Sequence, residues 1–364
     1  MPVTKINVGP IHPSTHGVLR LVVSLDGDTI VDVEPHIGFL HRGVEKLVEN
    51  RMYMQSIVYM EKLDYAAPLA YDDLYVATVE EATGIEVKER AKYLRVALLE
   101  LQRVASHLLW LGTMCNDLGL MFSLFMWTFR ERDKVLSILE SITGSRMFYV
   151  NFRLGGLVKD IPAGFVDTAI SELADLEKRI SEYERFLEKN PIFIERTRKV
   201  GVLSRDEAIE LGVTGPVLRA SGVEYDVRKN HPYYVYSKLH FKPQVQTGGD
   251  SLARYKVRML EMKESIRLAK EALNKMPDGD ALGMKIKLTS PPVKNSIVTV
   301  RREMPRGEGN MYMVADKQKP YRLAIRSGSF VNLSALPYMA RGRRFADLFA
   351  ILGSIDVVMA DVDK

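Results

Sequence analysis

Cysteine is almost absent from this sequence, because Cys115 is the only one among 364 residues. An intramolecular disulfide is therefore impossible. A chain with one thiol also cannot hold an iron–sulfur cluster by itself, since such clusters usually need four thiolates. This cysteine usage is typical of a reducing, intracellular compartment.

Long hydrophobic runs are also missing. No stretch of about 18 apolar residues occurs, so we expect no membrane-spanning helix. The N-terminal residues lack the pattern of a signal peptide. The net charge of +5 is spread among many acidic residues. This balance favours an acidic protein partner or a membrane surface over nucleic acid.

Most motifs of well-known enzyme classes are absent as well. The sequence contains no GxxxxGK[ST] phosphate loop, GxSxG nucleophile turn, HExxH zinc helix or CxxC pair. The glycines at 307 and 309 lack the third glycine and the strand–helix context of a dinucleotide fingerprint. These absences exclude the usual P-loop, serine-hydrolase and zinc-protease chemistries.

What the chain does contain is strong helical periodicity in its middle. Apolar residues over 88–112 recur at helical spacing and predict a long helix with a broad buried face. Segment 118–143 is apolar on most sides, so we expect it at the centre of a bundle, whereas the amphipathic segment 162–190 is expected outside. Further helices are predicted over 44–60, 69–83, 251–276 and most of 336–352.

Strand patterns occur near both ends. Residues 18–25 and 29–34 alternate around the turn pair Asp26-Gly27 and predict a hairpin. Further strands are predicted over 3–8, 297–301, 310–315 and 321–326. We therefore predict a single α+β, helix-dominated domain over 1–364. It has a β region over about 1–36, a helical body over about 40–275, and a small antiparallel sheet and helix over about 297–364.

Two histidines, His12 and His16, lie in the loop GPIHPSTHG. Pro13 and Gly17 oppose a helix, so the four-residue spacing does not place both rings on one face as a metal pair. Each histidine is either a loop residue bonded to backbone or a proton donor in a cleft, because histidine titrates near neutral pH.

Two further groups are candidates for chemistry. Tyr65 follows a predicted helix break and is either a packing residue or a phenol presented to a ligand. Asp117 lies in the most apolar segment, where an unpaired buried carboxylate is very costly. His107 is a candidate partner, and such a pair raises the pKa of the histidine; the alternative is a satisfied core histidine.

The sequence ends in GSIDVVMADVDK. Asp356, Asp361 and Asp363 either bind a hard cation, for which carboxylates are suited, or form a solvated acidic tail. Apolar neighbours such as Ile351 and Ile355 argue against a fraying tail. We expect this end to be ordered and buried at a subunit interface.

Taken in order, several segments resemble the 49 kDa, or D-type, subunit of respiratory complex I. They are GPIHPSTHGVLRLVVSLDGD, PHIGFLHRGVEKLVENR, LDYAAP, LLELQRVASHLLWLG, GPVLRASGVEYDVRK and GSIDVVMADVDK. The resemblance spans nearly the whole chain, and the family is related to the large subunits of nickel–iron hydrogenases. It implies a hydrogenase-large-subunit-like fold and a role as a core subunit of a membrane-bound respiratory oxidoreductase.

The hydrogenase relatives hold nickel and iron with two CxxC pairs. The corresponding regions here read YMEKLDYAAP and DVVMAD, with Val358 and Asp361 at the second pair's positions. Nickel needs soft thiolate ligands, so we expect no metal and interpret Val358 and Asp361 as the remnant of a metal site. In the complex I branch, the vacated cavity holds the head group of a quinone.

By this resemblance, His16 and Tyr65 hydrogen-bond the electron acceptor, and Asp117 pairs with His16. A quinone that gains two electrons needs two protons, which a His–Asp pair and a tyrosine can supply. The charge left behind is a starting point for ion pumping.

The sequence also departs from the family pattern next to the implied terminal 4Fe-4S cluster. Many members have arginine where Lys62 stands, and lysine lacks the planar fork of donors. Members with a high-potential, pH-dependent cluster have a histidine where Tyr149 stands. Losing a cationic neighbour lowers a cluster potential, so we predict a low-potential cluster and an acceptor such as menaquinone, a phenazine or sulfane sulfur.

The resemblance further implies that this chain alone binds no cofactor. A 4Fe-4S cluster is expected in a small adjoining iron–sulfur subunit, beside other hydrophilic-arm subunits and above a membrane arm, at the cytoplasmic face of the membrane. Electrons enter from NADH, reduced deazaflavin or ferredoxin through other subunits, so the NAD binding associated with the family is not visible here. The alternatives are the equivalent subunit of a sulfane-sulfur or phenazine reductase, and a non-catalytic scaffold.

Overall fold

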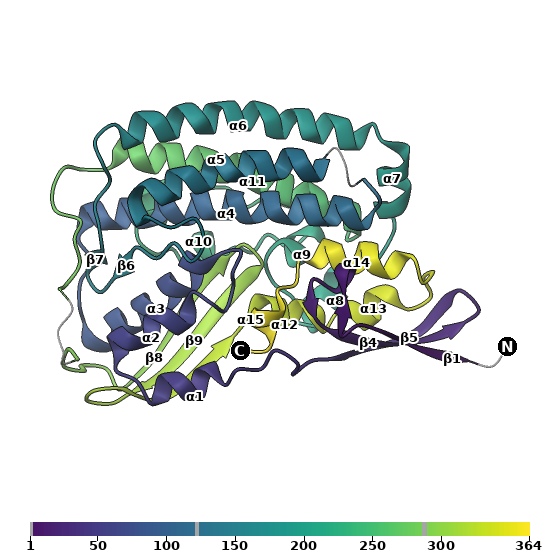
Figure 1. The fold of residues 1–364 in the computed structure, drawn as a ribbon, viewed down its shortest axis with the longest axis horizontal. Helices are drawn as coiled ribbons and strands as arrows, with labels where there is room; N and C mark the ends of the chain where they lie inside the picture. The colour runs from purple at the N-terminus through teal and green to yellow at the C-terminus, as the bar shows by residue number, and fades with distance from the viewer. Residues whose placement is uncertain (1–2, 121–123, 286–289) are drawn as a thin grey trace.

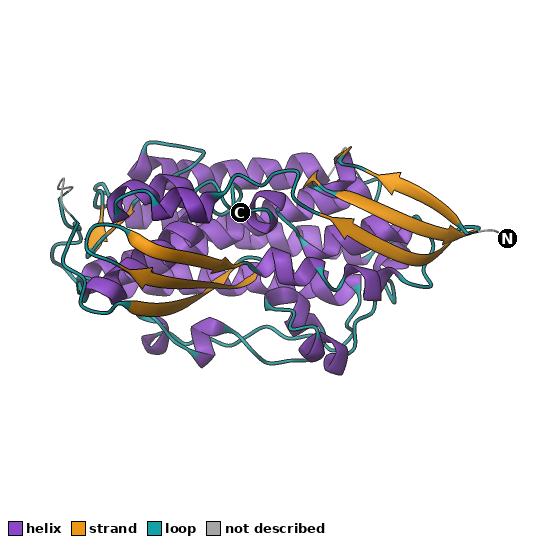
Figure 2. Ribbon diagram, turned by 90° about the horizontal axis from the view of Figure 1, so that it is seen from below, coloured by secondary structure: helices purple, strands orange, loops and turns teal. Residues whose placement is uncertain are grey.

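The computed structural model describes residues 3–120, 124–285 and 290–364. Long helices run along an elongated molecule, with α6 at its outer edge (Figure 1). Two three-stranded antiparallel sheets lie toward opposite ends of the helices, and the C-terminus lies between them (Figure 2). This is the α+β, helix-dominated arrangement that the sequence predicts.

The N-terminal sheet has the order β1–β4–β5, formed by β1 (Thr4–Val8), β4 (Arg20–Asp26) and β5 (Thr29–His36). The predicted hairpin is confirmed, since β4 and β5 pair antiparallel around Gly27. Between β1 and β4, the short pair β2 (Ile11–His12) and β3 (Gly17–Val18) encloses the 3-10 helix η1 (Pro13–Thr15). The loop that carries both histidines is therefore an ordered two-stranded hairpin, separate from the three-stranded sheet.

The helical body surrounds α4 (Glu89–Asp117), which is buried over nearly its whole length between α11 and α5. The other helices are α1 (Val44–Glu49), α2 (Tyr53–Met60), α3 (Pro68–Thr83), α5 (Met126–Thr143), α6 (Phe165–Glu188), α7 (Pro191–Thr197), α8 (Arg205–Glu210), α9 (Gly215–Ala220), α10 (Val227–Asn230), η3 (Tyr236–Lys238) and α11 (Ser251–Lys275). A small pair, β6 (Phe152–Arg153) and β7 (Gly156–Leu157), follows α5.

Three expectations for the helices need correction. The helix predicted over 44–60 is two helices, because the chain is extended at Met52. The bundle centre is α4, not segment 118–143: α5 begins only at Met126, and it exposes one face. The start of the predicted segment includes 121–123, which lie outside the described residues. The amphipathic helix α6 does lie outside, because only every third or fourth side chain is buried.

The C-terminal sheet has the order β10–β9–β8, with β8 (Ile297–Met304), β9 (Gly307–Ala315) and β10 (Pro320–Arg326). It is followed by α12 (Gly328–Leu333), α13 (Leu336–Ala340), α14 (Asp347–Ile355) and α15 (Met359–Val362). The predicted helix over 336–352 is thus two helices joined by an irregular stretch. Since α14 packs against α4 and η1, the end of the chain returns to the N-terminal loop.

Candidate acceptor-binding site

A pocket of about 180 Å³ lies where five distant parts of the chain meet. These parts are the N-terminal loop, the loop before α3, the end of α4, the turn between β8 and β9, and the segment after α14. The residues that line it are Pro13, His16, Tyr65, Ala66, Leu109, Trp110, Thr113, Asn116, Asp117, Arg306, Asp356, Val357 and Val358. The structure thus brings together residues that the sequence singles out separately, namely His16, Tyr65, Asp117, Asp356 and Val358.

The loop between β2 and β3 holds His16 in place by local backbone contacts. The imidazole Nδ1 of His12 accepts a hydrogen bond from the backbone N–H of Ser14 at 3.2 Å, and the Thr15 hydroxyl donates to the His12 carbonyl at 2.8 Å. His12 also stacks on Phe349 at a ring-centroid distance of 5.3 Å. His16 follows with φ 54°, a left-handed conformation. His12 therefore shapes the loop, and His16 faces the pocket.

His16 and Asp117 form a close pair. The His16 Nε2 and Asp117 Oδ2 atoms are 2.5 Å apart, and the two side chains are 12% and 4% exposed. Gly353 of α14 lies against the pair, since a methyl group there would be 3.3 Å from the Asp117 carboxylate. The pair combines a ring able to donate a proton with a carboxylate placed to orient it.

His107 is not the partner of Asp117, which corrects the expectation from sequence. Its Nε2 atom lies 2.9 Å from Glu261 Oε2 of α11, and its side chain is fully buried. Burial lowers the pKa of His107 although Glu261 opposes the shift. This direction is the opposite of the one expected, because complete desolvation disfavours the imidazolium.

Tyr65 enters the pocket from the loop before α3 and is 41% exposed. Its neighbour Asp64 is buried and accepts hydrogen bonds from the backbone N–H groups of Ala66 and Ala67 at 3.1 Å. These bonds fix the loop that presents the phenol. Burial raises the pKa of Asp64 to about 6, although Arg306 opposes the shift.

Sequence reasoning missed one charged pocket residue, Arg306, which lies beside Asp356 of the predicted acidic group. The Arg306 Nη1 donates to Asp64 at 2.8 Å, and its Nη2 lies 3.5 Å from Asp356 Oδ1. Burial opposes the charge of Arg306, but Asp356 and Asp64 outweigh it and raise its pKa. The sequence signal for Arg306 was the run Pro305-Arg306-Gly307 between two strands. In this turn the arginine is enclosed by protein and not solvated.

The turn that carries Arg306 is pressed against the start of α9. A side chain on Gly215, which has φ 62°, would collide with the backbone of Gly307. We expect Gly215→Ala to reduce the free energy of unfolding by more than the about 1 kcal/mol that a left-handed alanine costs. Chemical denaturation of the full chain measures this.

Gly212→Ala is the matched control. Gly212 has φ 65°, and the nearest atom to a methyl group placed there would be an arginine nitrogen 3.9 Å away. This variant should show the backbone cost alone. Equal losses for the two variants would contradict the close approach of α9 to the Arg306 turn.

Lys62 and Tyr149 are the two residues predicted to lie near the neighbouring iron–sulfur cluster. They come from two chain segments that are in contact. The Lys62 ammonium lies 5.4 Å from the ring centroid of Phe148, next to Tyr149 in the chain. It is also 2.6 Å from the Glu61 carboxylate. Tyr149 is 1% exposed, and its hydroxyl has no hydrogen-bond partner among the described residues. Neither residue lines the pocket.

The acidic C-terminus is buried within this chain. The Asp363 carboxylate accepts hydrogen bonds from the backbone N–H groups of Gly38 and Leu40 at 2.8 Å, and Asp361 accepts one from the Tyr71 hydroxyl. These contacts join the chain end to the β5–α1 connection and to α3. Ordered burial is thus confirmed, whereas the subunit interface expected there stays a prediction. Within residues 3–120, 124–285 and 290–364, no three His, Cys, Asp or Glu side chains converge as a metal site.

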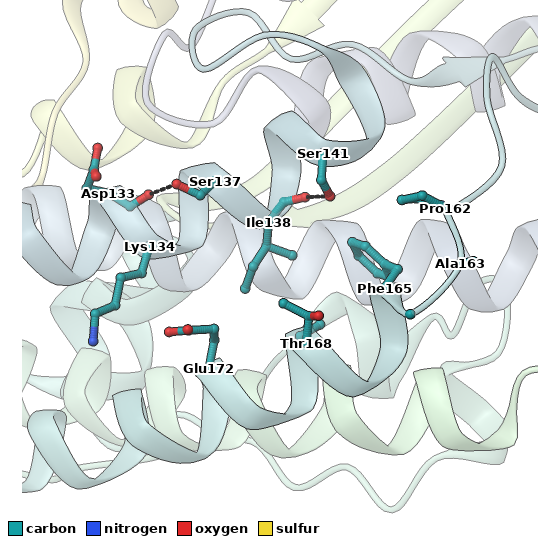
Figure 3. Close-up of a pocket in the computed structure, with 12 residues that line it drawn as sticks. Asp133, Lys134, Ser137, Ile138, Ser141, Pro162, Ala163, Phe165, Thr168 and Glu172 are labelled. Carbon is teal, nitrogen blue, oxygen red and sulfur yellow. Dashed lines mark hydrogen bonds between the residues drawn. The ribbon is translucent and has the colours of Figure 1, made fainter.

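A larger hollow of about 450 Å³ lies elsewhere, between α5 and α6. Figure 3 shows Ile138 of α5 pointing toward Thr168 of α6, with Phe165 beside them. Its polar groups are helix-surface side chains such as Lys134, which pairs with Asp175 at 2.9 Å. None of the residues predicted to act on an acceptor lines this hollow, so we assign the site to the smaller pocket.

Comparisons with known proteins agree with this geometry. The family described as "Respiratory-chain NADH dehydrogenase, 49 Kd subunit" matches residues 117–300 and 286–364. The D-type subunit of the NADH-quinone oxidoreductase of Dehalococcoides mccartyi is 45% identical over 360 residues, which cover 99% of this chain and 98% of that protein. This chain belongs to that 49 kDa subunit family.

Two further proteins are similar to this chain over nearly its whole length. A chloroplast NAD(P)H-quinone oxidoreductase subunit of Marchantia polymorpha is 42% identical over 99% of this chain and 97% of that protein. A chain in the solved structure of the membrane-bound sulfane sulfur reductase, described as an archaeal respiratory membrane complex, is 32% identical. It superposes with a TM-score of 0.94 over 100% of this chain and 98% of that one. The fold and family expected from the sequence are therefore confirmed.

The described part of this 49 kDa family member contains no helix that is both long and apolar enough to cross a membrane.

Proposed function

We propose that this chain forms the electron-acceptor site of a complex I-like oxidoreductase and binds the head group of a quinone-like acceptor in the pocket. The observation that carries this proposal is the convergence of the His16–Asp117 pair and Tyr65 on one cavity. Membership of the 49 kDa subunit family supports it. The pocket is small, and it has polar groups at the His16–Asp117 pair and at Tyr65. This arrangement suits a ring with two carbonyl oxygens better than a bulky substrate.

In this proposal, His16 and Tyr65 hydrogen-bond the acceptor and each donates one proton as it is reduced. Asp117, 2.5 Å from His16, orients the imidazole. Electrons come from a 4Fe-4S cluster in an adjoining subunit, because the chain's only cysteine, Cys115, is buried and single. Loss of the protons leaves charge beside Arg306 and Asp64, which we propose begins the coupling to ion pumping.

The partners that fit this role are a small iron–sulfur subunit, other hydrophilic-arm subunits and a membrane arm, at the cytoplasmic face of the membrane. The relatives' names, as subunits of NADH-quinone oxidoreductases, support such an assembly. NADH, reduced deazaflavin and ferredoxin all stay candidate donors, because this chain shows no site for any of them within its described residues. The similarity to a chain of a sulfane sulfur reductase complex favours that enzyme class as the second candidate.

Lys62 and Tyr149 lead to a prediction about the neighbouring cluster. The charge of Lys62 is partly neutralised by Glu61, and Tyr149 offers a buried phenol in place of an imidazole. We expect a low midpoint potential that changes little between pH of about 6 and about 8, where histidine titrates. Redox titration of the assembled complex, followed by electron paramagnetic resonance, measures this potential.

Tyr149→His should raise the potential and make it pH-dependent, whereas Tyr149→Phe should do neither. A high, pH-dependent potential in the unmodified complex would overturn the prediction of a low-potential acceptor.

Acceptor identity is then tested by finding what occupies the space between His16 and Tyr65 in the complex incubated with menaquinone, a phenazine or polysulfide. An occupant elsewhere would refute the proposed site.

A further inference from the structure

A second group of ionisable side chains lies behind the pocket, in the interior of the helical body. It consists of carboxyl groups and guanidinium groups that are at most 4% exposed. Its members are the carboxyl groups of Glu100, Asp226, Glu261 and Glu303 and the guanidinium groups of Arg103, Arg219 and Arg228. We call this the α4–α11 charge cluster. None of its members lines the acceptor pocket.

Arg219 of α9 is the centre of the cluster. It lies 2.5 Å from Glu261, 2.9 Å from Glu303 and 3.2 Å from Asp226. Arg228 joins Asp226 at 2.7 Å to Glu100 at 3.0 Å. The carboxyl groups therefore share guanidinium partners instead of each having its own.

Arg103 completes the set from α4. It lies 3.3 Å from Glu100 and donates to the backbone carbonyl of Glu303 at 2.6 Å. With all acids ionised, four negative charges would face three positive ones in a water-poor interior. His107 does not correct this, because burial lowers its pKa. The adjacent Arg258 is matched by Asp356 at 4.0 Å. A buried net charge is costly, so the cluster has room for one proton.

The contacts indicate which acid holds that proton. Arg228 and Arg103 overcome burial and lower the pKa of Glu100 to about 2. Arg219 and the His107 contact likewise lower the pKa of Glu261. Glu303 differs, because burial and then Asp226 raise its pKa against the three arginines. The proton therefore belongs to Glu303.

Both carboxyl oxygens of Glu303 have hydrogen-bond partners. Its Oε1 accepts from Arg219, and its Oε2 accepts from the backbone N–H of Val227 at 3.1 Å. Glu308 is its cross-strand neighbour on β9. Glu308 has partners of its own, the Tyr225 hydroxyl at 3.0 Å and Arg301 at 3.9 Å.

The cluster and the pocket are joined by two helices. On α4, His107 contacts Glu261 of the cluster, and the adjacent Ser106 accepts a hydrogen bond from Arg306 of the pocket at 3.0 Å. On α11, Arg258 lies one turn before Glu261, and its guanidinium carbon is 4.7 Å from the ring centroid of Trp110, which lines the pocket. The cluster therefore lies about one helical turn from the pocket wall. A change of charge in the cluster acts electrostatically on the pocket over this distance.

We propose that the α4–α11 charge cluster is a proton-binding site, in which Glu303 takes up and releases a single proton behind the wall of the acceptor pocket. Release converts the Glu303 carboxylic acid to a carboxylate and one free proton, with no electron transferred. The carboxylate then lies between Arg219 and the Val227 N–H group. Use of this proton during acceptor reduction rests on the proposed function, whereas the proton-binding site itself does not.

Infrared difference spectroscopy of the assembled complex, with isotope-labelled glutamate in this chain, tests the site. The unmodified complex should show a carboxylic acid C=O band that disappears as the pH rises through neutrality. Glu303→Gln should lose this band, and the matched Glu308→Gln should keep it. If Glu303→Gln fails to assemble, Asp226→Asn equalises the charges and should lose the band as well.

A titrating band that persists in Glu303→Gln overturns the proposal, as does the absence of any titrating acid in the unmodified complex. Acceptor reduction is recorded in the same samples across pH. The profile should lose one titration step in Glu303→Gln, and Glu303→Asp should restore it. If Tyr65→Phe and His16→Ala leave reduction intact while the band behaves as expected, the proposed function fails and the proton-binding site stands.

Discussion

Tyr65→Phe is expected to lower acceptor reduction by the assembled complex by about 100-fold or more. Phenylalanine keeps the ring in the loop fixed by Asp64 and removes only the hydroxyl, which we propose donates a proton to the acceptor. General acid catalysis by a positioned side chain contributes about 100-fold to 10,000-fold. Because Tyr65 is 41% exposed and Asp64 makes the structural bonds of the loop, folding and assembly should be unchanged.

His16→Ala should have an effect of the same order, since it removes the second donor and leaves Asp117 without its partner. The measurement is steady-state acceptor reduction by purified complex, with subunit content checked on each preparation. Tyr321→Phe is the control for a lost hydroxyl, because that residue is 76% exposed and does not line the pocket. If both site variants keep normal rates, the chain is a scaffold and the assignment of the pocket is wrong.

Sequence patterns were sufficient for features that depend on local spacing. The β4–β5 hairpin follows from its turn pair, and α6 follows from a single apolar stripe. The centre of the bundle was misjudged because hydrophobicity alone was counted. The actual central helix, α4, buries Arg95, Arg103 and His107 among its apolar residues. Such residues look like surface positions in a sequence until their partners on other elements are known.

The site was predicted in part for the same reason. His16, Tyr65 and Asp117 were chosen because their segments resemble a family, and they do converge. The pairing of His107 with Asp117 was wrong, because residues 10 apart on one helix do not meet, whereas Glu261 on α11 does reach His107. Sequence reasoning did not identify Arg306, because its partners Asp64 and Asp356 are 242 and 50 residues away in the chain.

Loss of Arg306 should strongly destabilise the fold. The Arg306 guanidinium contacts both Asp64 and Asp356 next to the pocket, and it is 3% exposed. Arg306→Ala leaves both carboxylates buried beside a cavity. Removing one partner of a buried ion pair costs about 3–5 kcal/mol, and we expect a loss of this size in the free energy of unfolding at pH of about 8. Urea denaturation of the full chain measures it.

The dependence of this loss on pH separates charge from packing. In the unmodified chain, burial already raises the pKa of Asp64 to about 6 against the pull of Arg306. Without Arg306, the pKa of Asp64 rises further in the folded state, so the folded variant takes up a proton as the pH falls. Its deficit should therefore shrink between pH of about 8 and about 5. Arg301→Ala, at a side chain 47% exposed on the same sheet, should cost under about 1 kcal/mol at either pH. A deficit for Arg306→Ala that is the same at both pH values would mean that the side chain acts by filling space, and the electrostatic account of the pocket would then be wrong.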